Sequence, residues 1–329
     1  MKEVLISIII PVYNVESKIN KLLDSLCRLK NKDIEIILID NNSVDNSLNI
    51  INEYSKKDKR SKVYKEKKAG ANYARYLGFT KCNGKYVYFI DSDDYIETDN
   101  INKVLDILRK KDVDILIGNY NELDSNYNFI KIMNCFGKDN ILLYKPCLWN
   151  KIFKKELIKK DSFIFTSIGE DMYLTLPIIA SSNKIEYFNK PIYNYIKNIN
   201  GLSSKNSYEL LNDSLKSLKL LKEKFIKNNL YNKNYEEINY VLITHSLYRA
   251  FKGILLDKKD KNKIRDKVLS FLNELDYKNN KYYKKSMIYK LVMFLIKFKF
   301  LYNFILTRFM VYLLFNNKIF NKILKKIDK

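Results

Sequence analysis

Continuous apolar runs, separated by amphipathic segments, dominate the first third of the chain. Residues 5–14, "LISIIIPVYN", and residues 34–40, "IEIILID", have almost no polar positions, which is typical of strands buried on both faces of a sheet. Shorter runs at 62–66 and 85–91 predict two further strands. Between the runs, apolar positions recur at helical spacing. Helices are therefore expected at residues 16–29, 43–57 and 71–82, the second of them beginning with Ser43 as its cap.

Strands that alternate with helices of this length predict an α/β fold, with a mostly parallel central sheet and helices on both faces. The pattern then loosens. Residues 113–120 and 129–135 predict strands, residues 170–182 a helix, and residues 184–196 two short strands that are broken at Pro191.

The remainder of the chain has helical periodicity throughout. Amphipathic segments lie at 207–228, 235–256 and 260–275, and a last stretch runs from residue 283 to the end. We therefore expect two domains, a catalytic α/β domain at 1–205 and a helical, basic region at 206–329.

Composition narrows the class of protein. Hydrophobic residues make up 47% of the 329 residues, enough for a sizeable core. The four cysteines lie far apart without a CxxC pair, which favours reduced thiols, and the apolar N-terminal run has no cleavage site typical of a signal peptide. These features predict a cytoplasmic protein. The net charge of +23 indicates an anionic partner, such as nucleic acid, a phospholipid surface or a phosphorylated substrate.

Carboxylates gather where two of the predicted strands end. Asp40 ends the second strand, and Asp91, Asp93 and Asp94 follow the fourth. In open α/β sheets ligands bind outside the carboxyl ends of the strands, so all four side chains belong to one edge. Carboxylates this close repel one another unless a cation screens them, and oxygen ligands suit Mg²⁺ or Mn²⁺. The alternative is a solvated turn, in which Asp94 fits a helix cap.

Familiar nucleotide-binding signatures are missing. No GxGxxG follows the first strand, and GxxxxGK[ST] occurs nowhere, which argues against a dinucleotide enzyme and a P-loop enzyme. Any nucleotide must be held in another way.

Four segments, in this order and at this spacing, resemble the family 2 glycosyltransferases of GT-A fold. They are "SIIIPVYNVE", "IILIDNNSVDNS", "GANYARYLGF" and "GKYVYFIDSDDYI". The resemblance covers roughly residues 4 to 200, because "LWNKIFKKE" at 148–156 and "IGEDMYLTLPII" at 168–179 extend it. It implies the GT-A nucleotide-diphospho-sugar transferase fold, and an inverting, metal-dependent hexosyl- or N-acetylhexosaminyltransferase that uses a UDP-sugar.

The resemblance also implies roles for residues of the donor site. Pro11, Val12 and Tyr13 would line the uracil pocket, and Asp40 would accept a hydrogen bond from the uracil ring; alternatively, Pro11 simply ends a strand and Asp40 caps a helix. Arg75 would pair with the diphosphate. Asp91, Ser92 and Asp93 would form the DxD motif, with Asp93 as the metal ligand and Asp91 nearer the ribose.

Where many members carry an Asn-Gly pair before the shared "AR", this chain has "EKKAGANYAR". Lys67 or Lys68 would then contact phosphate instead.

A general base is needed to deprotonate the acceptor hydroxyl. The resemblance assigns this role to Asp171 in "GEDM", with Glu170 positioning the acceptor; the alternative is a plain pair of acids that complements a helix N-terminus. His245, the only histidine, falls in the helical region and is interpreted as structural. Trp149 would either stack on a sugar of the acceptor or pack in the core.

The end of the chain concentrates basic charge. From Lys281 to Lys329 there are 12 Lys and Arg residues against one Asp, among many apolar and aromatic residues. No uncharged run reaches the length of a spanning helix. The segment instead suits a helix at an anionic membrane surface, which fits a peripheral enzyme at the inner face of the cell membrane and a lipid-linked or glycan acceptor of surface-polysaccharide synthesis. The alternative is a packed helical bundle with solvated lysines.

Two rival functions use the same features less well. A basic nucleic-acid-binding protein would explain the net charge but not the acidic edge, and no nucleic-acid-binding motif is visible. A nucleotidyltransferase would use acidic metal ligands but needs a glycine-rich first loop to hold a triphosphate, which is absent. The sequence therefore favours a glycosyltransferase that does not bind nucleic acid.

Overall fold

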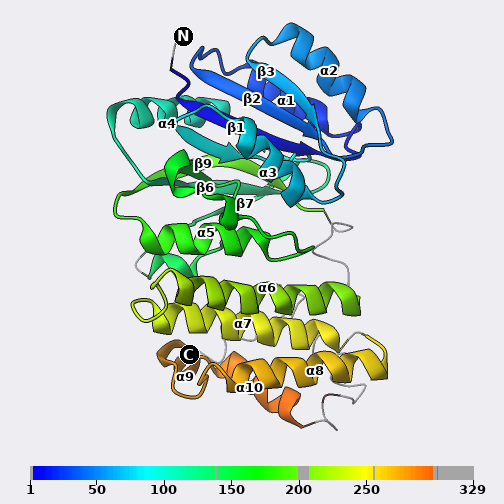
Figure 1. Cartoon of the computed structure of the whole chain (residues 1–329), viewed down its shortest axis with the longest axis vertical. Helices are drawn as coiled ribbons and strands as arrows, with labels where there is room; N and C mark the ends of the chain where they lie inside the picture. Colours follow the sequence, from blue (N-terminus) through cyan, green and yellow to red (C-terminus); the bar gives the residue numbers. More distant parts are fainter. Residues whose placement is uncertain (1–2, 138, 199–206, 255, 299–301, 303–329) are drawn as a thin grey trace. The chain divides into compact units, whose positions relative to one another are not determined.

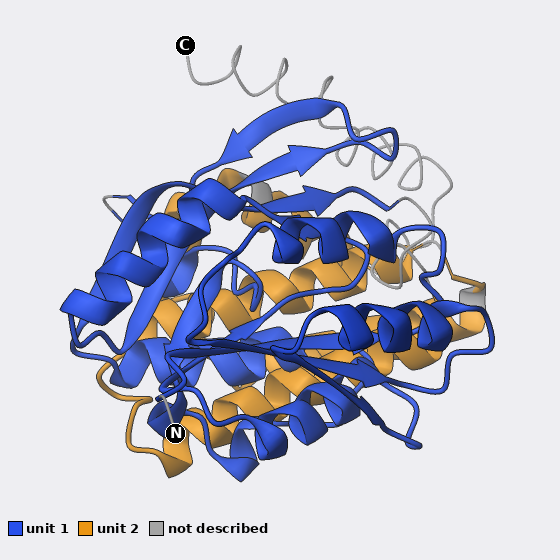
Figure 2. Ribbon diagram, turned by 90° about the horizontal axis from the view of Figure 1, so that it is seen from above, with its two compact units in different colours: residues 1–201 blue, residues 202–329 orange. Residues whose placement is uncertain are grey.

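The computed structural model describes residues 3–137, 139–198, 207–254, 256–298 and 302 (Figure 1). The chain divides into two compact units, residues 1–201 and residues 202–329 (Figure 2). The domain boundary expected at 205 falls between residues 199 and 206, outside the described residues, and it stays a prediction.

The first unit contains a nine-stranded sheet in the part of the chain that the structure describes. Its first four strands lie in the order β3-β2-β1-β4 and are all parallel. They are β1 (Ile6–Val12), β2 (Ile34–Asp40), β3 (Ser61–Lys65) and β4 (Tyr86–Phe89). Every residue of β1, β2 and β4 is buried, which confirms the interpretation of their continuous apolar runs.

Helices connect these strands as predicted: α1 (Ile19–Cys27), α2 (Ser47–Lys57) and α3 (Ala71–Lys81). The expected N-cap of α2 is wrong by three residues. Asn46 is the N-cap, whereas Ser43 belongs to the loop after β2. There the Ser43 hydroxyl accepts a hydrogen bond from the backbone of Asn14 at 3.3 Å, and its own N–H donates to the carboxylate of Asp40 at 3.3 Å.

The other half of the sheet is mixed. From β4 it continues through β8 (Lys151–Lys154), β6 (Ile115–Leu123), β9 (Ile185–Ile196) and β5 (Tyr95–Ile96), with β7 (Phe129–Met133) beside β6. Only β6 and β9 pair in parallel here. The predicted strands within 113–120 and 129–135 and the helix α5 (Glu170–Ser181) are confirmed, whereas β5, β8 and the helix α4 (Thr98–Lys110) were not expected.

The sequence predicted two short strands broken at Pro191, and this prediction is wrong. β9 is one strand of 12 residues with an irregular register beside β6. Gly118 pairs with Phe188, and the next residue, Asn119, already pairs with Pro191. The extra residues leave the ladder at this point, so the proline, which lacks an N–H, lies in a bulge rather than at a strand end.

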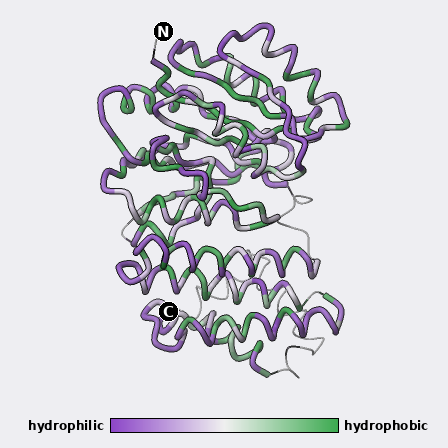
Figure 3. The backbone as a smooth tube through the Cα atoms, in the orientation of Figure 1, coloured by the Kyte–Doolittle hydropathy of each residue, from purple (hydrophilic) through white to green (hydrophobic). Residues whose placement is uncertain are grey.

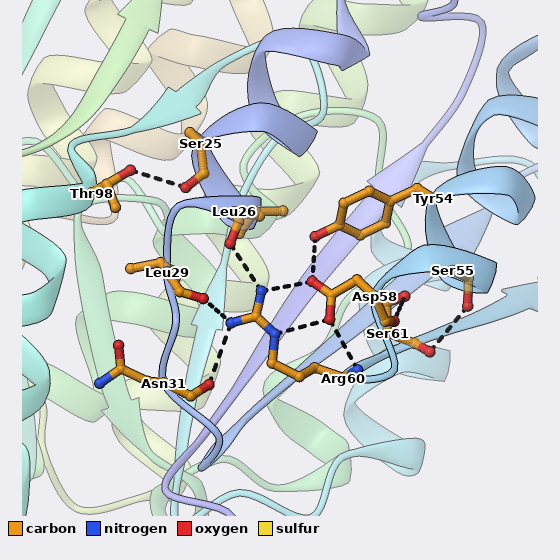
Figure 4. A network of polar contacts seen from close by, with 10 residues as sticks. All are labelled: Ser25, Leu26, Leu29, Asn31, Tyr54, Ser55, Asp58, Arg60, Ser61 and Thr98. Carbon is orange, nitrogen blue, oxygen red and sulfur yellow. Dashed lines mark hydrogen bonds and ion pairs between the residues drawn. The ribbon is translucent and has the colours of Figure 1, made fainter.

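Arg60 joins the end of α1 to the turn between α2 and β3 (Figure 4). Its guanidinium donates to the backbone carbonyl of Leu26, in the last turn of α1, and to that of Leu29, just after the helix. It also pairs with the carboxylate of Asp58 at 2.6 Å, which accepts a hydrogen bond from the Tyr54 hydroxyl at 2.9 Å. One side chain therefore links the end of α1 to the turn that follows α2.

The second unit is helical in its described part. It contains α6 (Tyr208–Lys227), α7 (Tyr235–Gly253), α8 (Lys258–Asn273), α9 (Lys281–Lys285) and α10 (Met287–Lys297). Helix α7 contacts the other four helices, and hydrophobic positions recur along each long helix (Figure 3). The three amphipathic segments are thus confirmed, while most of the stretch predicted from 283 to the end lies outside the described residues. Among the described helices, none has both the length and the apolar composition of a membrane-spanning segment.

We expect Arg60→Met to lower the free energy of unfolding of the first unit by roughly 2–3 kcal/mol, because it removes a hydrogen-bond donor from two backbone carbonyls and the charged partner of the Asp58 carboxylate. Urea unfolding can be followed by the fluorescence of Trp149, the only tryptophan, which is buried in this unit. The control is Arg109→Met, which removes a more exposed ion pair with Asp33 and should cost less than about 1 kcal/mol. Equal losses in the two variants would contradict the role of Arg60.

Candidate functional site

The carboxyl ends of β1, β2 and β4 meet at one edge of the sheet. Val12 pairs with Asp40 at the ends of β1 and β2, and Ile9 pairs with Phe89 in β4. Asp91 follows two residues after Phe89, so the acidic segments that the sequence placed at one edge do lie there. Parallel strands thus deliver residues distant in sequence to a single edge, where α/β folds place their ligands.

The residues expected at the uracil pocket line the end of β1. Pro11 and Val12 are buried inside the strand, so Pro11 does not end it, whereas Tyr13 is 58% exposed. Asp40 is buried, and its carboxylate accepts a hydrogen bond from the N–H of Ser43. Because α2 begins seven residues later, the helix-cap alternative for Asp40 is wrong.

Asn41, for which no role is predicted from the sequence, holds the loop between β3 and α3. Its amide group donates to the carbonyls of Glu66 at 3.0 Å and Lys68 at 2.7 Å, and it accepts from the N–H of Gly70 at 2.8 Å. Gly70 has a φ of 131°, which favours glycine. The loop therefore has a fixed shape, and it leaves the side chain of Lys67 exposed beside the site edge.

Asp94 is not a helix cap, because α4 begins only at Thr98. It is buried, and its carboxylate accepts hydrogen bonds from the Tyr193 hydroxyl at 2.8 Å and the N–H of Ile196 at 2.7 Å. The same Tyr193 oxygen accepts from the N–H of Asp91 at 3.2 Å. Asp94 and Tyr193 thus fasten the acidic turn to β9, which leaves Asp91 and Asp93 as the carboxylates available to a ligand.

Asp93 carries charge that its surroundings balance poorly. Burial, followed by the nearby charge of Asp91, raises its pKa, and the only ion pair described for it is a long one, 3.9 Å, with Lys18. Ser92, between the two acids, is buried. A hard divalent cation would relieve this repulsion, so Asp91 and Asp93 fit a metal such as Mn²⁺ or Mg²⁺.

The protein would supply only part of such a coordination sphere. Among the described residues, no group of three or more His, Cys, Asp or Glu side chains is arranged to hold a metal ion. Magnesium-like ions usually take one or two protein carboxylates, with water and phosphate oxygens as the other ligands. The acidic turn therefore fits a cation that arrives with a phosphorylated substrate better than a metal bound alone.

Arg75 lies at the centre of the site and is buried, with 7% of its side chain exposed. Its Nη2 is 2.8 Å from the carboxylate of Asp91, and its Nη1 is 3.5 Å from that of Glu170 and 3.7 Å from that of Asp171. Burial lowers the pKa of Arg75, but the three carboxylates outweigh it and raise that pKa overall. The guanidinium expected to meet a diphosphate is therefore engaged by carboxylates.

Glu170 and Asp171 open α5, directly after Gly169, which has a φ of 99°. Burial raises the pKa of both side chains, and that of Asp171 reaches about 7 although Arg75 opposes the shift. The Oδ1 atom of Asp171 is buried and has no hydrogen-bond partner among the described residues, while 33% of the side chain remains exposed. A carboxylate with this pKa and an oxygen without a hydrogen-bond donor can accept a proton near neutral pH.

Lys151 is a buried lysine whose charge acts on Asp171. Lys151 is 2% exposed, and its ammonium donates to the carbonyls of Lys145 at 3.1 Å and Cys147 at 2.8 Å, and to the side chain of Asn150 at 2.7 Å. Burial lowers its pKa, and its charge lowers that of Asp171. The sequence shows only a lysine in a lysine-rich stretch, so burial in the folded chain is the signal that identifies it.

Trp149 and His245 do not contribute exposed side chains to the site. Trp149 is 5% exposed; its ring stacks on Tyr193 at 4.7 Å and on Tyr195 at 5.4 Å, so the packing favours its core alternative. His245 lies on α7 in the second unit. Burial, followed by the charge of Arg249, lowers its pKa to about 3, so its imidazole stays neutral.

Known proteins are similar to this chain in sequence and in fold. Residues 7–168 match the model of glycosyl transferase family 2. The glycosyltransferase GlyG of Streptococcus pneumoniae serotype 4 is 34% identical over 211 residues, which cover 58% of this chain and 70% of GlyG. GlyA of the same organism is 32% identical over 209 residues, but the chain spans only 30% of its length.

Two further proteins match over a larger part of the chain. The poly(ribitol-phosphate) beta-N-acetylglucosaminyltransferase TarP of Staphylococcus aureus (strain N315) is 25% identical over 84% of this chain and 86% of TarP. The crystal structure of S. aureus TarS superposes with a TM-score of 0.70, at 20% identity, over 91% of this chain and 54% of TarS. A structure of TarS 1-349 in complex with UDP-GlcNAc gives a TM-score of 0.57, at 19% identity, over 83% of this chain and 90% of TarS 1-349. The predicted GT-A fold with an appended helical region is confirmed.

We expect Asp171→Asn to be more stable than wild type at pH 8 and close to wild type in stability at pH 4, in EDTA. The pKa of Asp171 is about 7 in the folded protein against an ordinary value of 3.8, so the folded state binds the proton more tightly than the unfolded chain. That advantage is complete below about pH 4 and is lost as the pH rises through 7, and asparagine does not lose it.

Thermal unfolding at both pH values measures this difference. Asp106→Asn, an exposed aspartate on α4, is the matched control and should show no such dependence on pH. A variant less stable than wild type at pH 8 would mean that the ion pair with Arg75 outweighs the cost of burial.

Proposed function

Because the chain belongs to glycosyl transferase family 2, we propose that it is a glycosyltransferase that moves a sugar from a UDP-sugar to a hydroxyl group of an acceptor. The observation that carries this proposal is the cluster around Arg75, which places a metal-compatible acidic turn and a carboxylate of raised pKa on either side of one guanidinium. Family membership sets aside the nucleic-acid-binding and nucleotidyltransferase alternatives.

The donor would lie across the ends of β1, β2 and β4. We assign Pro11, Val12 and Tyr13 to the uracil, with Asp40 as the acceptor for its ring N–H. We assign Lys67 and Arg75 to the diphosphate, and Asp91 and Ser92 to the ribose. The complex of TarS 1-349 with UDP-GlcNAc supports this choice of nucleotide, since the two proteins share the fold.

Asp93, with Asp91, would hold Mn²⁺ or Mg²⁺. When bound, such a cation supplies Lewis-acid stabilisation of the negative charge on the departing diphosphate. The chain's own contribution is to present two carboxylates on a turn that Asp94 and Tyr193 keep in place.

Asp171 is our candidate for the general base. Its carboxylate, through the exposed part of the side chain, would take the proton of the acceptor hydroxyl as the oxygen attacks the anomeric carbon, while the bond from that carbon to the diphosphate breaks and UDP leaves with the electron pair. Attack from the face opposite UDP inverts the anomeric centre. Glu170 would orient the acceptor, and Trp149, whose ring stacks on Tyr193 and Tyr195, would act only through its packing.

We propose that the acceptor is a glycan or lipid-linked glycan of cell-surface polysaccharide synthesis. The similarity to TarP, whose name describes transfer to poly(ribitol-phosphate), supports a polymeric surface acceptor. The net charge of +23 fits an anionic acceptor and a peripheral location at the inner face of the cell membrane.

The donor assignment predicts metal-dependent UDP binding. In titration calorimetry with Mn²⁺, wild type should bind UDP, and EDTA should weaken this binding at least tenfold, since Asp91 and Asp93 would hold a cation that offsets the charge of the diphosphate. Asp93→Asn should bind UDP about as weakly in Mn²⁺ as wild type does in EDTA. Asp106→Asn, the same change at an exposed position, should behave like wild type. UDP binding that ignores both EDTA and Asp93→Asn would contradict the assigned metal site.

The base assignment predicts a loss of turnover without a loss of donor binding. Asp171→Asn should lower kcat by about 10²–10⁴-fold, the usual contribution of a general base, and should leave the affinity for UDP within about twofold. Wild-type activity should rise with pH through about 7, because only the ionised carboxylate accepts the proton.

Release of UDP from UDP-GlcNAc, UDP-glucose and UDP-galactose, with membrane extract as acceptor, measures both effects. A flat pH profile between 6 and 8, or normal turnover by Asp171→Asn, would show that another group is the base.

A further inference from the structure

Helix α10 exposes a row of large apolar side chains. Met287, Leu291, Phe294 and Phe298, hereafter the α10 stripe, are 74%, 45%, 50% and 52% exposed. Their spacing of four, three and four residues places them on one side of the helix and its last turn. The rings of Phe294 and Phe298 lie 4.8 Å apart. A contiguous apolar row of this kind marks an interaction surface rather than scattered exposed residues.

The fold holds this surface in place. On the opposite side of α10, Val292, Met293 and Ile296 are buried in the second unit. Arg265 of α8 donates to the carbonyl of Ile296 at 2.6 Å and to that of Lys297 at 2.7 Å, which satisfies the end of the helix. The helix is therefore anchored through its buried side and does not need the α10 stripe for its own packing.

Lysines lie along one edge of the α10 stripe and precede it in the sequence. Lys290 and Lys297 are exposed and fall along one edge of it by helical spacing, and Lys284 and Lys285 precede it in α9. No acidic residue occurs between Lys281 and Lys297. Lysines can keep their ammonium groups in water while their stems lie along an apolar surface.

We propose that the α10 stripe docks on an anionic phospholipid surface, with the helix lying in the plane of the interface. Apolar residues on one side and lysines along the edge are the pattern of an interfacial helix, and two signals together give stable binding where one does not. A second copy of this chain would bring the same lysines face to face, which disfavours self-association through this surface. This proposal rests on the proposed function only in that it identifies the surface that would serve the membrane location given there.

Vesicle binding tests the proposal without any need for sugar transfer. The full chain should sediment with phosphatidylcholine vesicles that contain phosphatidylglycerol, should not sediment with pure phosphatidylcholine, and should be released by salt. Phe294→Ser combined with Phe298→Ser should weaken binding at least tenfold. Lys290→Gln combined with Lys297→Gln should weaken it by about fivefold for each lysine and reduce its dependence on salt.

The matched control is Phe129→Ser, which removes a phenylalanine that is 61% exposed on β7 in the first unit. It should bind vesicles like wild type. Far-UV circular dichroism checks that the phenylalanine variant stays folded. If that variant unfolds, the lysine variant tests the proposal, because its two substitutions change only exposed side chains.

Three results would overturn the proposal: no binding of wild type to the anionic vesicles at low salt, equal binding by wild type and both double variants, or light scattering that shows a dimer which the phenylalanine changes convert to monomers. The last result would identify the α10 stripe as an interface between copies of this chain. Because UDP binding is measured separately, failure here leaves the transferase proposal standing.

Discussion

The arrangement of the site depends on one buried guanidinium. Arg75, on α3, faces Asp91 after β4 and the Glu170–Asp171 pair at the start of α5, and these carboxylates lie 16 and 95 or more residues away in the sequence. One positive charge cannot neutralise three negative ones, and in a buried site the remainder is costly. Burial, together with the charges of neighbouring carboxylates, raises the pKa values of Glu170 and Asp171 and also that of Asp93 in the acidic turn. This excess of negative charge lowers the stability of the protein without ligand. It also favours the binding of a cation at the acidic turn and of a proton at Asp171.

Part of this could be predicted because it depends on local pattern. Strands buried on both faces appear as continuous apolar runs, so β1 and β2 were predicted within a residue or two of their observed ends. Parallel strands share an edge, and this rule alone places Asp40 and Asp91 on the same side of the sheet. The order of four segments then indicates the family, which no single residue of the site could do alone. Short elements gave no such signal: β8 has four residues, two of them lysines, and β5 has two.

The contacts that hold the site in place could not be predicted, because they join residues far apart in sequence. From the sequence Asp94 resembles a helix cap. In the structure its carboxylate instead accepts hydrogen bonds from Tyr193 and Ile196, about 100 residues later. Asn41 looks like a loop residue of little consequence until it binds three backbone groups of the loop before α3. Polar residues of this kind have several possible local partners, and only the folded chain decides among them.

The net charge of the chain and the local charge at the site affect different binding partners. Salt screens exposed charges beyond a Debye length of roughly 8–10 Å, so the many surface lysines have little influence on a carboxylate whose counter-ion is Arg75 at 2.8 Å. The acidic edge is therefore compatible with a net charge of +23. What the surface charge does govern is the approach of large anionic partners, because each of them faces many lysines at once. A small donor that arrives with a divalent cation and a large anionic acceptor or membrane can thus be recognised by opposite electrostatics on the same chain.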